Sequence, residues 1–157
     1  MTIVMAIDPG PVQSAFVQLN TLTERIVNAN KFDNGTLRIL CAPPRNRDDR
    51  LAIEMIASYG MPVGAEVFQT CVEIGRFIEA WGIGESPTLV YRKDVKLHLC
   101  GQTRAKDSNI RQALIDRWGG KAATKKGGAL SGIKADMWSA LAVAVTWSDL
   151  HAGKAAA

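Results

Sequence analysis

Three isolated carboxylates are the side chains of this sequence best suited to do chemistry. Asp8 ends an apolar run and is followed by Pro-Gly, Glu54 interrupts a second apolar run, and Asp136 opens a long apolar segment. A carboxylate on a buried strand is costly unless it is paired, hydrogen-bonded or bound to a cation. Three such positions in a small chain indicate one shared cation site. Ligands that are all oxygens favour Mg²⁺ or Mn²⁺ over zinc.

The elements that must position these carboxylates follow from the hydrophobic pattern. We expect strands at 2–8, 13–20, 24–32, 51–57 and 87–91, and helices at 63–81, 93–100, 107–118 and 134–150. Short connections between the first three strands favour an antiparallel meander. The segment 33–49 is left unassigned, except that Pro43-Pro44 and the charged run 45–50 indicate an exposed loop, and the Gly- and Lys-rich segment 119–133 is expected to be mobile.

Length and composition limit the class of protein. The 157 residues, 47% of them hydrophobic, predict a single domain at 1–150 and a frayed tail at 151–157. Three cysteines in unlike contexts are typical of reduced thiols in the cytoplasm. No apolar run approaches about 20 residues, and no signal peptide is recognisable, so we expect no membrane segment.

Positive charge is concentrated in the middle of the chain. Residues 92–126 hold ten Lys and Arg against three acidic residues, a net charge of +7, and the remainder carries −3 of the overall +4. A basic stretch of this kind is a reasonable electrostatic footprint for nucleic acid. A solvated helical face has the same composition, so charge alone leaves both interpretations open.

The order of the elements predicts the ribonuclease-H-like fold, an α/β fold with a five-stranded mixed sheet flanked by helices. Three strands are antiparallel and the last two are parallel. The first and fourth strands are neighbours in that fold, so Asp8 and Glu54 should lie side by side, with Asp136 brought against them by the last helix. Three carboxylates this close cannot all stay ionised without a cation. Two divalent ions would offset the repulsion between the carboxylates. In phosphodiester cleavage, one ion would activate a water and the other would stabilise the leaving oxygen.

An ordered set of motifs carries a resemblance to a known family. The motifs are Ala6-Ile7-Asp8-Pro9-Gly10 with Ser14-Ala15, then Ile53-Glu54, then Asp94-Val95-Lys96 with Gly101, Ala105-Lys106 and Ser108-Asn109-Ile110, and finally Ala135-Asp136 with the apolar run 140–144. In this set the chain resembles the RuvC family of Holliday-junction resolvases, and most closely a compact phage or prophage branch of it. The resemblance covers nearly the whole chain and is weakest at 33–49 and 119–133.

The resemblance implies a homodimeric, Mg²⁺-dependent endonuclease of DNA recombination and repair in a bacterial cytoplasm. Such an enzyme binds four-way DNA junctions and nicks two strands symmetrically. The catalytic and metal-binding acids of the family match Asp8, Glu54 and Asp136, with two Mg²⁺ expected and Mn²⁺ able to substitute. The dimer helix of the family matches helix 63–81. This helix has two apolar stripes, one through Val67, Cys71 and Ile74 and one through Phe68 and Val72. It can therefore be wholly internal or lie between its own sheet and a second subunit, and the resemblance favours the second alternative.

One departure from the family concerns the fourth acid, which the family places one helical turn after the third. This chain has Ser139 there. Ser139 shares a helix face with Asp136, so its hydroxyl can still reach a metal ion through a water, but it supplies no negative charge. Glu73, Asp107 and Asp149 are candidates to replace the missing charge, although each is also expected at the surface.

Basic and aromatic residues near these motifs are the candidates for DNA contact. Lys96 lies in the family's Val-Lys pattern, and Tyr59 follows the Glu54 strand, where it can stack on an unpaired base. The expected DNA-binding set is Lys96, Arg104, Lys106, Lys125, Lys126, Lys134 and Tyr59. A plain surface role remains the alternative for each lysine, and burial remains the alternative for Tyr59.

Two other functions stay open from the sequence. The first is a broader nuclease that acts on flaps, forks and other replication intermediates. The second is a junction-binding protein with weak or no catalysis, which the absent acid at Ser139 favours. An actin-like ATPase is excluded, because the chain lacks the Gly-rich phosphate loops that such a domain needs.

Overall fold

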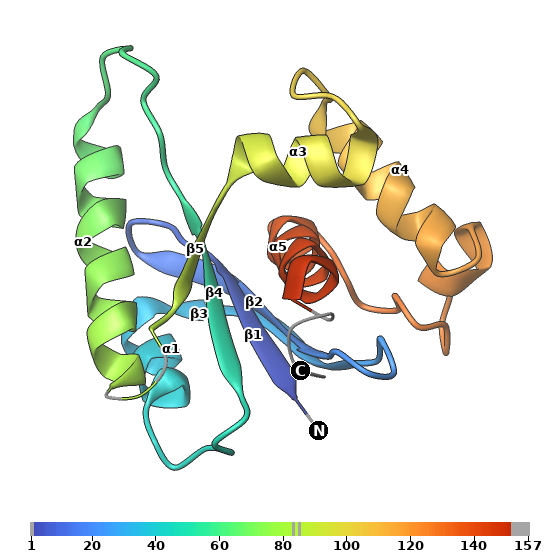
Figure 1. Cartoon of the computed structure of the whole chain (residues 1–157), viewed down its shortest axis with the longest axis horizontal. Coiled ribbons are helices and arrows are strands. Elements are labelled where there is room, and N and C mark those ends of the chain that lie inside the picture. Colours follow the sequence, from blue (N-terminus) through green and yellow to red (C-terminus); the bar gives the residue numbers. More distant parts are fainter. Residues whose placement is uncertain (1, 83, 85, 152–157) are drawn as a thin grey trace.

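A five-stranded mixed sheet is the centre of the computed structural model, which describes residues 2–82, 84 and 86–151 (Figure 1). The spatial order is β3-β2-β1-β4-β5. β2 is antiparallel to both β1 and β3, whereas β4 is parallel to both β1 and β5. The predicted sheet is therefore confirmed. Its strands are β1 (Ile3–Asp8), β2 (Gln13–Asn20), β3 (Ile26–Asp33), β4 (Arg50–Met55) and β5 (Thr88–Tyr91).

Helices cover both faces of this sheet. α1 (Asn34–Cys41) and α2 (Ala65–Trp81) lie on one face, and α5 (Met137–His151) lies on the other (Figure 1). α3 (Arg92–Cys100) and α4 (Asp107–Arg117) pack over α5, and the short 3-10 helix η1 (Lys121–Thr124) follows α4. The predicted helix order is confirmed, with one additional helix, α1.

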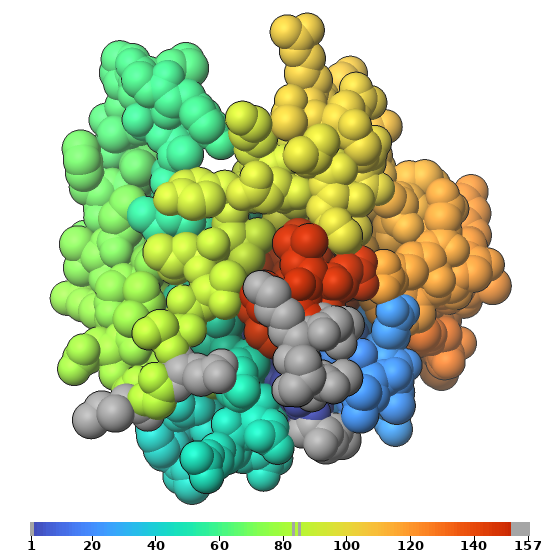
Figure 2. Space-filling model, viewed as in Figure 1, coloured from blue at the N-terminus to red at the C-terminus, as the bar shows by residue number. Residues whose placement is uncertain are grey.

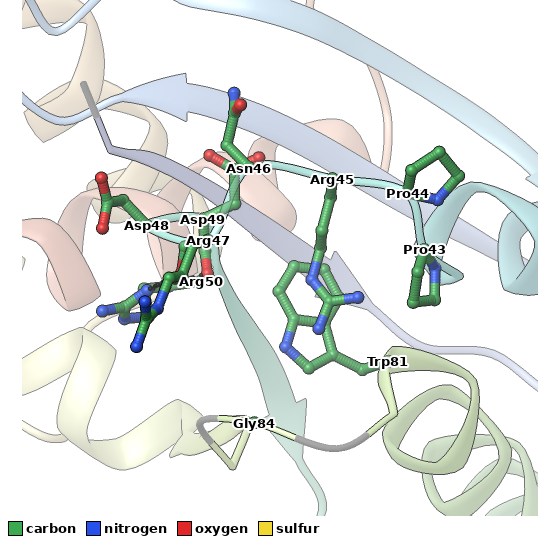
Figure 3. A pocket seen from close by; sticks show the side chains of 10 residues that line it. All are labelled: Pro43, Pro44, Arg45, Asn46, Arg47, Asp48, Asp49, Arg50, Trp81 and Gly84. Carbon is green, nitrogen blue, oxygen red and sulfur yellow. Dashed lines mark hydrogen bonds between the residues drawn. The ribbon is translucent and has the colours of Figure 1, made fainter.

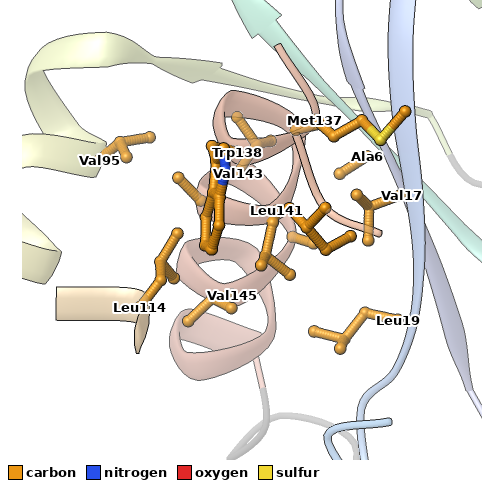
Figure 4. Packing of buried hydrophobic residues seen from close by; sticks show 14 of the residues in the cluster. Ala6, Val17, Leu19, Val95, Leu114, Met137, Trp138, Leu141, Val143 and Val145 are labelled. Atoms are coloured by element: carbon orange, nitrogen blue, oxygen red, sulfur yellow. The ribbon is translucent and has the colours of Figure 1, made fainter. Parts of the chain in front are cut away.

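α5 is buried on all sides because it lies between the sheet and the α3–α4 pair. In Figure 4, Leu141 lies towards Val17 on the sheet, while Trp138 lies towards Val95 on α3. A helix that is apolar all round is expected where two layers cover it. This burial fixes the start of α5, and with it the position of Asp136.

The sheet has one hydrophobic core on each face, and the side chains of β1 alternate between the two cores. Val4 and Ala6 belong to the core under α5, whereas Met5 and Ile7 belong to the core under α1 and α2. Successive side chains of a strand point to opposite faces. Asp8 therefore continues the Val4–Ala6 pattern and faces the side of the sheet that α5 covers.

Two segments differ from the sequence-based expectation. Within 33–49, which the sequence left unassigned apart from the expected loop around Pro43-Pro44, Asn34–Cys41 forms the helix α1, with Leu37 and Cys41 buried. Asp33 starts this helix, since its side chain accepts a hydrogen bond from the Thr36 backbone N–H. The expected mobile segment 119–133 instead places three apolar side chains in the core, namely Ala123, Leu130 and Ile133.

The end of the last helix extends one residue into the predicted tail. His151 is helical and stacks on Trp147, with ring centroids 4.5 Å apart. The rest of the predicted tail, residues 152–157, lies outside the described residues. Among the helices of the described part, none has the length and apolar character needed to cross a membrane.

Candidate active site

One transverse row of the sheet carries two of the three predicted acids. Asp8 pairs with Ala15 across β1 and β2, and Ala15 pairs with Lys31 across β2 and β3. On the other side, the parallel register of β1 and β4 makes Glu54 the neighbour of Asp8. Side chains in one row point to the same face of a sheet. Lys31, Asp8 and Glu54 therefore share a face, with only the small Ala15 between Lys31 and Asp8.

A buried hydrogen-bond network fixes the turn that follows Asp8. Ser14 Oγ accepts from the Gly10 backbone N–H at 3.1 Å and donates to Asn34 Oδ1 at 2.7 Å. Asn34 Nδ2 donates back to the Gly10 carbonyl at 2.9 Å. Gly10 is required here, because a Cβ atom would lie 2.3 Å from the Gln13 carbonyl oxygen. Sequence reasoning noted Ser14 but missed Asn34, which lies in the unpredicted helix α1.

Asp136 is the residue immediately before α5. Its carbonyl accepts hydrogen bonds from the backbone N–H groups of Ser139 and Ala140, which starts the helix. Its carboxylate forms an ion pair with Lys31, with Nζ and Oδ2 2.5 Å apart. Sequence reasoning did not identify Lys31, because its approach to the acids depends on the pairing register of β3.

Arg92 is a second cation that sequence reasoning did not single out. It is the first residue of α3, directly after β5. Its Nη1 lies 3.5 Å from Glu54 Oε2, and its Nη2 donates to Asp107 Oδ1 at 2.6 Å. The structure thus connects Asp107, the first residue of α4, to the predicted site through Arg92.

The electrostatics of the site show that the charges of Glu54 and Asp136 both act on Asp8. Burial, together with the charges of Glu54 and Asp136, raises the pKa of Asp8 to about 7, against the opposing effects of Arg92 and Lys31. Burial also raises the pKa of Glu54, although Arg92 acts in the opposite direction. The carboxylates therefore lie close enough to compete for protons, as expected for acids that share one cation.

The residues present fit a divalent cation in their chemistry. The donors are carboxylate oxygens, which Mg²⁺ and Mn²⁺ prefer. Glu54 Oε2 is buried and has no hydrogen-bond partner in the described structure, so it retains an unused lone pair. As the described side chains stand, however, no three His, Cys, Asp or Glu residues form a ready metal cluster. Lys31 and Arg92 pair with two of the three acids in this arrangement.

Two of the predicted DNA-binding residues lie beside the acids. The surface is hollowed between the β4–α2 connection and the α3–α4 region (Figure 2). Tyr59 and Lys96 line a cavity there together with Arg92, Lys93 and Thr103. Tyr59 is exposed rather than buried, and Lys96 is near enough to favour the charged form of Glu54. The two residues are therefore placed to contact a ligand that reaches the acids.

The other basic candidates are distributed more widely. Arg104 and Lys106 are exposed between α3 and α4, and Lys134 is exposed two residues before Asp136. Lys125 and Lys126 are also exposed, but the glycines that follow them line a cavity with the β2–β3 turn. That turn is at the end of the sheet opposite to Asp8. The structure thus does not bring Lys125 and Lys126 together with the other candidates.

Ser139 stands where the family has its fourth acid, and it lines the same cavity as the Asp107 carboxylate. Ser139 and Asp136 line a cavity with Asp107 and Arg92. Of the other two candidate acids, Glu73 is buried and not at the surface as expected, because Arg38 and Arg76 both bind it at 2.7 Å. Asp149 pairs with Arg117 and His98, again away from the site. Asp107 is therefore the candidate that the structure places beside Arg92 and Glu54.

A separate hollow lies where β4 begins, at the opposite end of that strand from Glu54. The connection between α1 and β4 lines it, and the Arg45 guanidinium lies 3.8 Å above the centre of the Trp81 ring (Figure 3). Its charged residues are Arg45, Arg47, Asp48, Asp49 and Arg50. None of the three predicted acids lines it, so it is not part of the candidate active site.

Comparison with known proteins agrees with this architecture. No family model matches the chain, and no curated protein matches it. By comparison with solved structures, the fold of this chain is ribonuclease-H-like. Within that class, the chain is similar to a Thermus thermophilus RuvC structure, with a TM-score of 0.73, 17% identity, and coverage of 98% of this chain and 96% of the other.

A second structure extends the comparison. Thermus thermophilus RuvC in complex with a Holliday junction substrate matches with a TM-score of 0.67, 17% identity and the same coverage, 98% and 96%. At this identity the likeness shows the fold, and it confirms the RuvC-like fold that the sequence motifs predicted.

Proposed function

We propose that this protein is a metal-dependent, structure-specific endodeoxyribonuclease that resolves four-way and other branched DNA junctions. The observation that carries the proposal is the gathering of Asp8, Glu54 and Asp136 at one edge of a RuvC-like fold. The effect of the Glu54 and Asp136 charges on the pKa of Asp8 supports a shared cation site. The resemblance of the motifs supports action in a bacterial cytoplasm and a phage or prophage origin.

The proposed roles of the acids follow from their environments. Burial and the charges of both other acids raise the pKa of Asp8, which supports a bridging role between two cations. Glu54 and Asp136 would flank it. Bound Mg²⁺, or Mn²⁺ in its place, would supply charge stabilisation for phosphodiester hydrolysis. Ser139 is proposed to contact the metal through a water only.

DNA binding is proposed for the hollow beside the acids. Lys96 and Tyr59 lie in the cavity next to Arg92, and Lys106 and Lys134 are exposed near Asp107 and Asp136 in the sequence. Phosphate contacts of this kind position a nucleic acid without reading its sequence. Arg104 follows Thr103 of this cavity and belongs to the same proposal, and Lys125 and Lys126 belong to it as more distant phosphate contacts.

A homodimer through α2 is part of the same proposal. The buried side of α2, with Ile74 and Phe77, packs on the sheet, whereas Phe68 and Val72 are 64% and 50% exposed. A helix with one apolar face on its own sheet and another in solvent is suited to cover a second copy. A two-fold dimer presents two equal sites, as paired nicks in a junction require.

Cleavage of a set of labelled DNA substrates tests this function. A synthetic four-way junction, a flap, a fork and a linear duplex of matched sequence would be incubated with Mg²⁺ or Mn²⁺. We expect paired, symmetric nicks in the junction and none in the duplex. Efficient cutting of flaps and forks would favour the broader nuclease, and degradation of the duplex would contradict structure specificity.

A junction-binding protein with weak catalysis is the second candidate. Two observations favour it: Ser139 lacks the charge of a fourth acid, and Lys31 and Arg92 pair with two of the three remaining acids. Binding of the junction without cleavage in either metal would support this candidate over the nuclease.

A further inference from the structure

Arg92 lies between two carboxylates, one of which belongs to the proposed metal site. Its Nη2 donates to Asp107 Oδ1 at 2.6 Å, and its Nη1 lies 3.5 Å from Glu54 Oε2. The Arg92 side chain is 25% exposed, against 77% for Asp107 and 16% for Glu54. A largely buried guanidinium depends on charged neighbours to offset its lost hydration.

The two contacts of Arg92 are unequal. The bond to Asp107 is a short charge-assisted hydrogen bond, whereas 3.5 Å to Glu54 is an ion-pair distance that is too long for a strong hydrogen bond. Arg92 Nη1 and Glu54 Oε2 are both buried and both lack a hydrogen-bond partner in the described structure. The guanidinium is therefore fixed on the Asp107 side, and the Glu54 carboxylate keeps an oxygen that another cation can take.

We propose that Arg92 is the resident counter-ion of the site: it offsets the charge of Glu54 when no metal is bound and competes with a divalent cation for that carboxylate. This inference rests on the proposed function, because it takes Glu54 as a metal ligand. A guanidinium a few ångströms away repels a divalent cation at the same carboxylate. Metal binding is then coupled to a shift of Arg92 away from Glu54.

Asp107 has a defined part in this competition. Since it already holds Nη2, it offers the guanidinium a partner after the metal takes Glu54, so Arg92 need not become an unpaired buried charge. Asp107 is thus a positioning residue that acts on the metal site through Arg92.

Titration of the DNA-free, metal-free full-length protein with Mn²⁺, followed by electron paramagnetic resonance, tests the competition without using activity. We expect R92Q to bind Mn²⁺ about tenfold more tightly than the wild type, the size of effect that one adjacent opposite charge has on a carboxylate. R92K keeps the charge and should stay close to the wild type.

The matched control is R111Q. Arg111 lines the same cavity and loses the same formal charge, but its guanidinium lies over the Trp138 ring, 4.8 Å from the ring centre, rather than on a carboxylate. We expect little change in Mn²⁺ affinity for this variant. Equal affinities of R92Q and R111Q would overturn the proposal, and weaker binding by R92Q would show that Arg92 orients Glu54 instead of competing for it.

A double-mutant cycle tests the part of Asp107. D107N should weaken Mn²⁺ binding in the wild type, because Arg92 is then left with Glu54 as its carboxylate partner, but it should have little effect in the R92Q background. An equal loss in both backgrounds would contradict action through Arg92. Circular dichroism of each variant would show that the fold is retained.

The same titration separates this inference from the proposed function. Mn²⁺ binding to the wild type that is lost in D8N, with no gain in R92Q, would overturn the counter-ion role of Arg92 and leave the metal site standing. Absence of Mn²⁺ binding in both the wild type and R92Q would overturn both.

Discussion

Replacement of Asp8 by Asn should stabilise the metal-free protein at neutral and alkaline pH. Burial, together with the charges of Glu54 and Asp136, raises the pKa of Asp8 from its ordinary 3.8 to about 7 in the folded protein. Between these values the folded state holds a proton that the unfolded state has lost. Stability therefore falls as the pH rises from about 4 to about 7, and the cost is complete above that window.

The size of this effect follows from the shift. A rise from 3.8 to about 7 spans about three pH units, and each unit is worth about 1.4 kcal/mol. Asn carries no charge at any pH, so the D8N protein avoids a cost of about 4 kcal/mol at pH 8. At pH 5 the advantage should fall to about 1.7 kcal/mol, because only about the first of these three units has then been crossed.

Urea unfolding with EDTA, at intervals from pH 5 to pH 8, measures the free energy of unfolding of both proteins. The exposed substitution D48N, far from the site in the α1–β4 connection, is the control for loss of one acid. Addition of Mn²⁺ at 100 times its dissociation constant should restore about 2.7 kcal/mol to the wild type and little to D8N. A difference between D8N and the wild type that does not grow with pH would refute the reasoning.

Three further substitutions test other parts of the account. S139D adds an acid beside Asp136 and should tighten Mn²⁺ binding about tenfold, measured by calorimetry; an unchanged affinity would show that the missing charge is not limiting. F68D places a charge on the exposed face of α2 and should convert a dimer into a monomer in light scattering, whereas V27D, on an exposed strand position, should not. L141A removes a fully buried side chain of α5 and should lower the free energy of unfolding by about 2–5 kcal/mol, and a loss near zero would contradict the packing of α5 on the sheet.

The strands along the chain and the placement of three carboxylates at strand or helix ends could be predicted because local patterns indicate both. Asp8 and Glu54 each end or interrupt an apolar strand, and the all-apolar helix after Asp136 predicts a helix enclosed by two layers. Each signal lies within one segment of the chain, where burial periodicity is informative.

The contacts between segments were not predictable in the same way. Lys31 reaches Asp136 only through the register of β3 against β2, and a change of one residue would turn it to the other face. Arg92 reaches Glu54 because α3 starts immediately after β5. The basic segment that includes Arg92 was interpreted as a footprint for nucleic acid or as a solvated helical face, and nothing in its local sequence indicates that this arginine pairs with an acid of the site.

The missed helix α1 has a related cause. It is short, its sequence begins Asn-Gly-Thr, and Pro43-Pro44 follows closely, so local propensity favours a loop. The helix forms because Asp33 caps it and because Leu37 and Cys41 are buried against the sheet and α2. Tertiary burial therefore decides the structure of this segment.

The most direct test of the central claim is to measure cleavage and binding of one labelled four-way junction by the wild type and by D8N, in Mg²⁺ and in Mn²⁺. The account predicts symmetric nicking by the wild type, no nicking by D8N, and junction affinities within a few-fold of each other, because Asp8 holds the cation and the basic residues hold the DNA. Cleavage by D8N at the rate of the wild type would contradict the claim that these three carboxylates form the catalytic metal site.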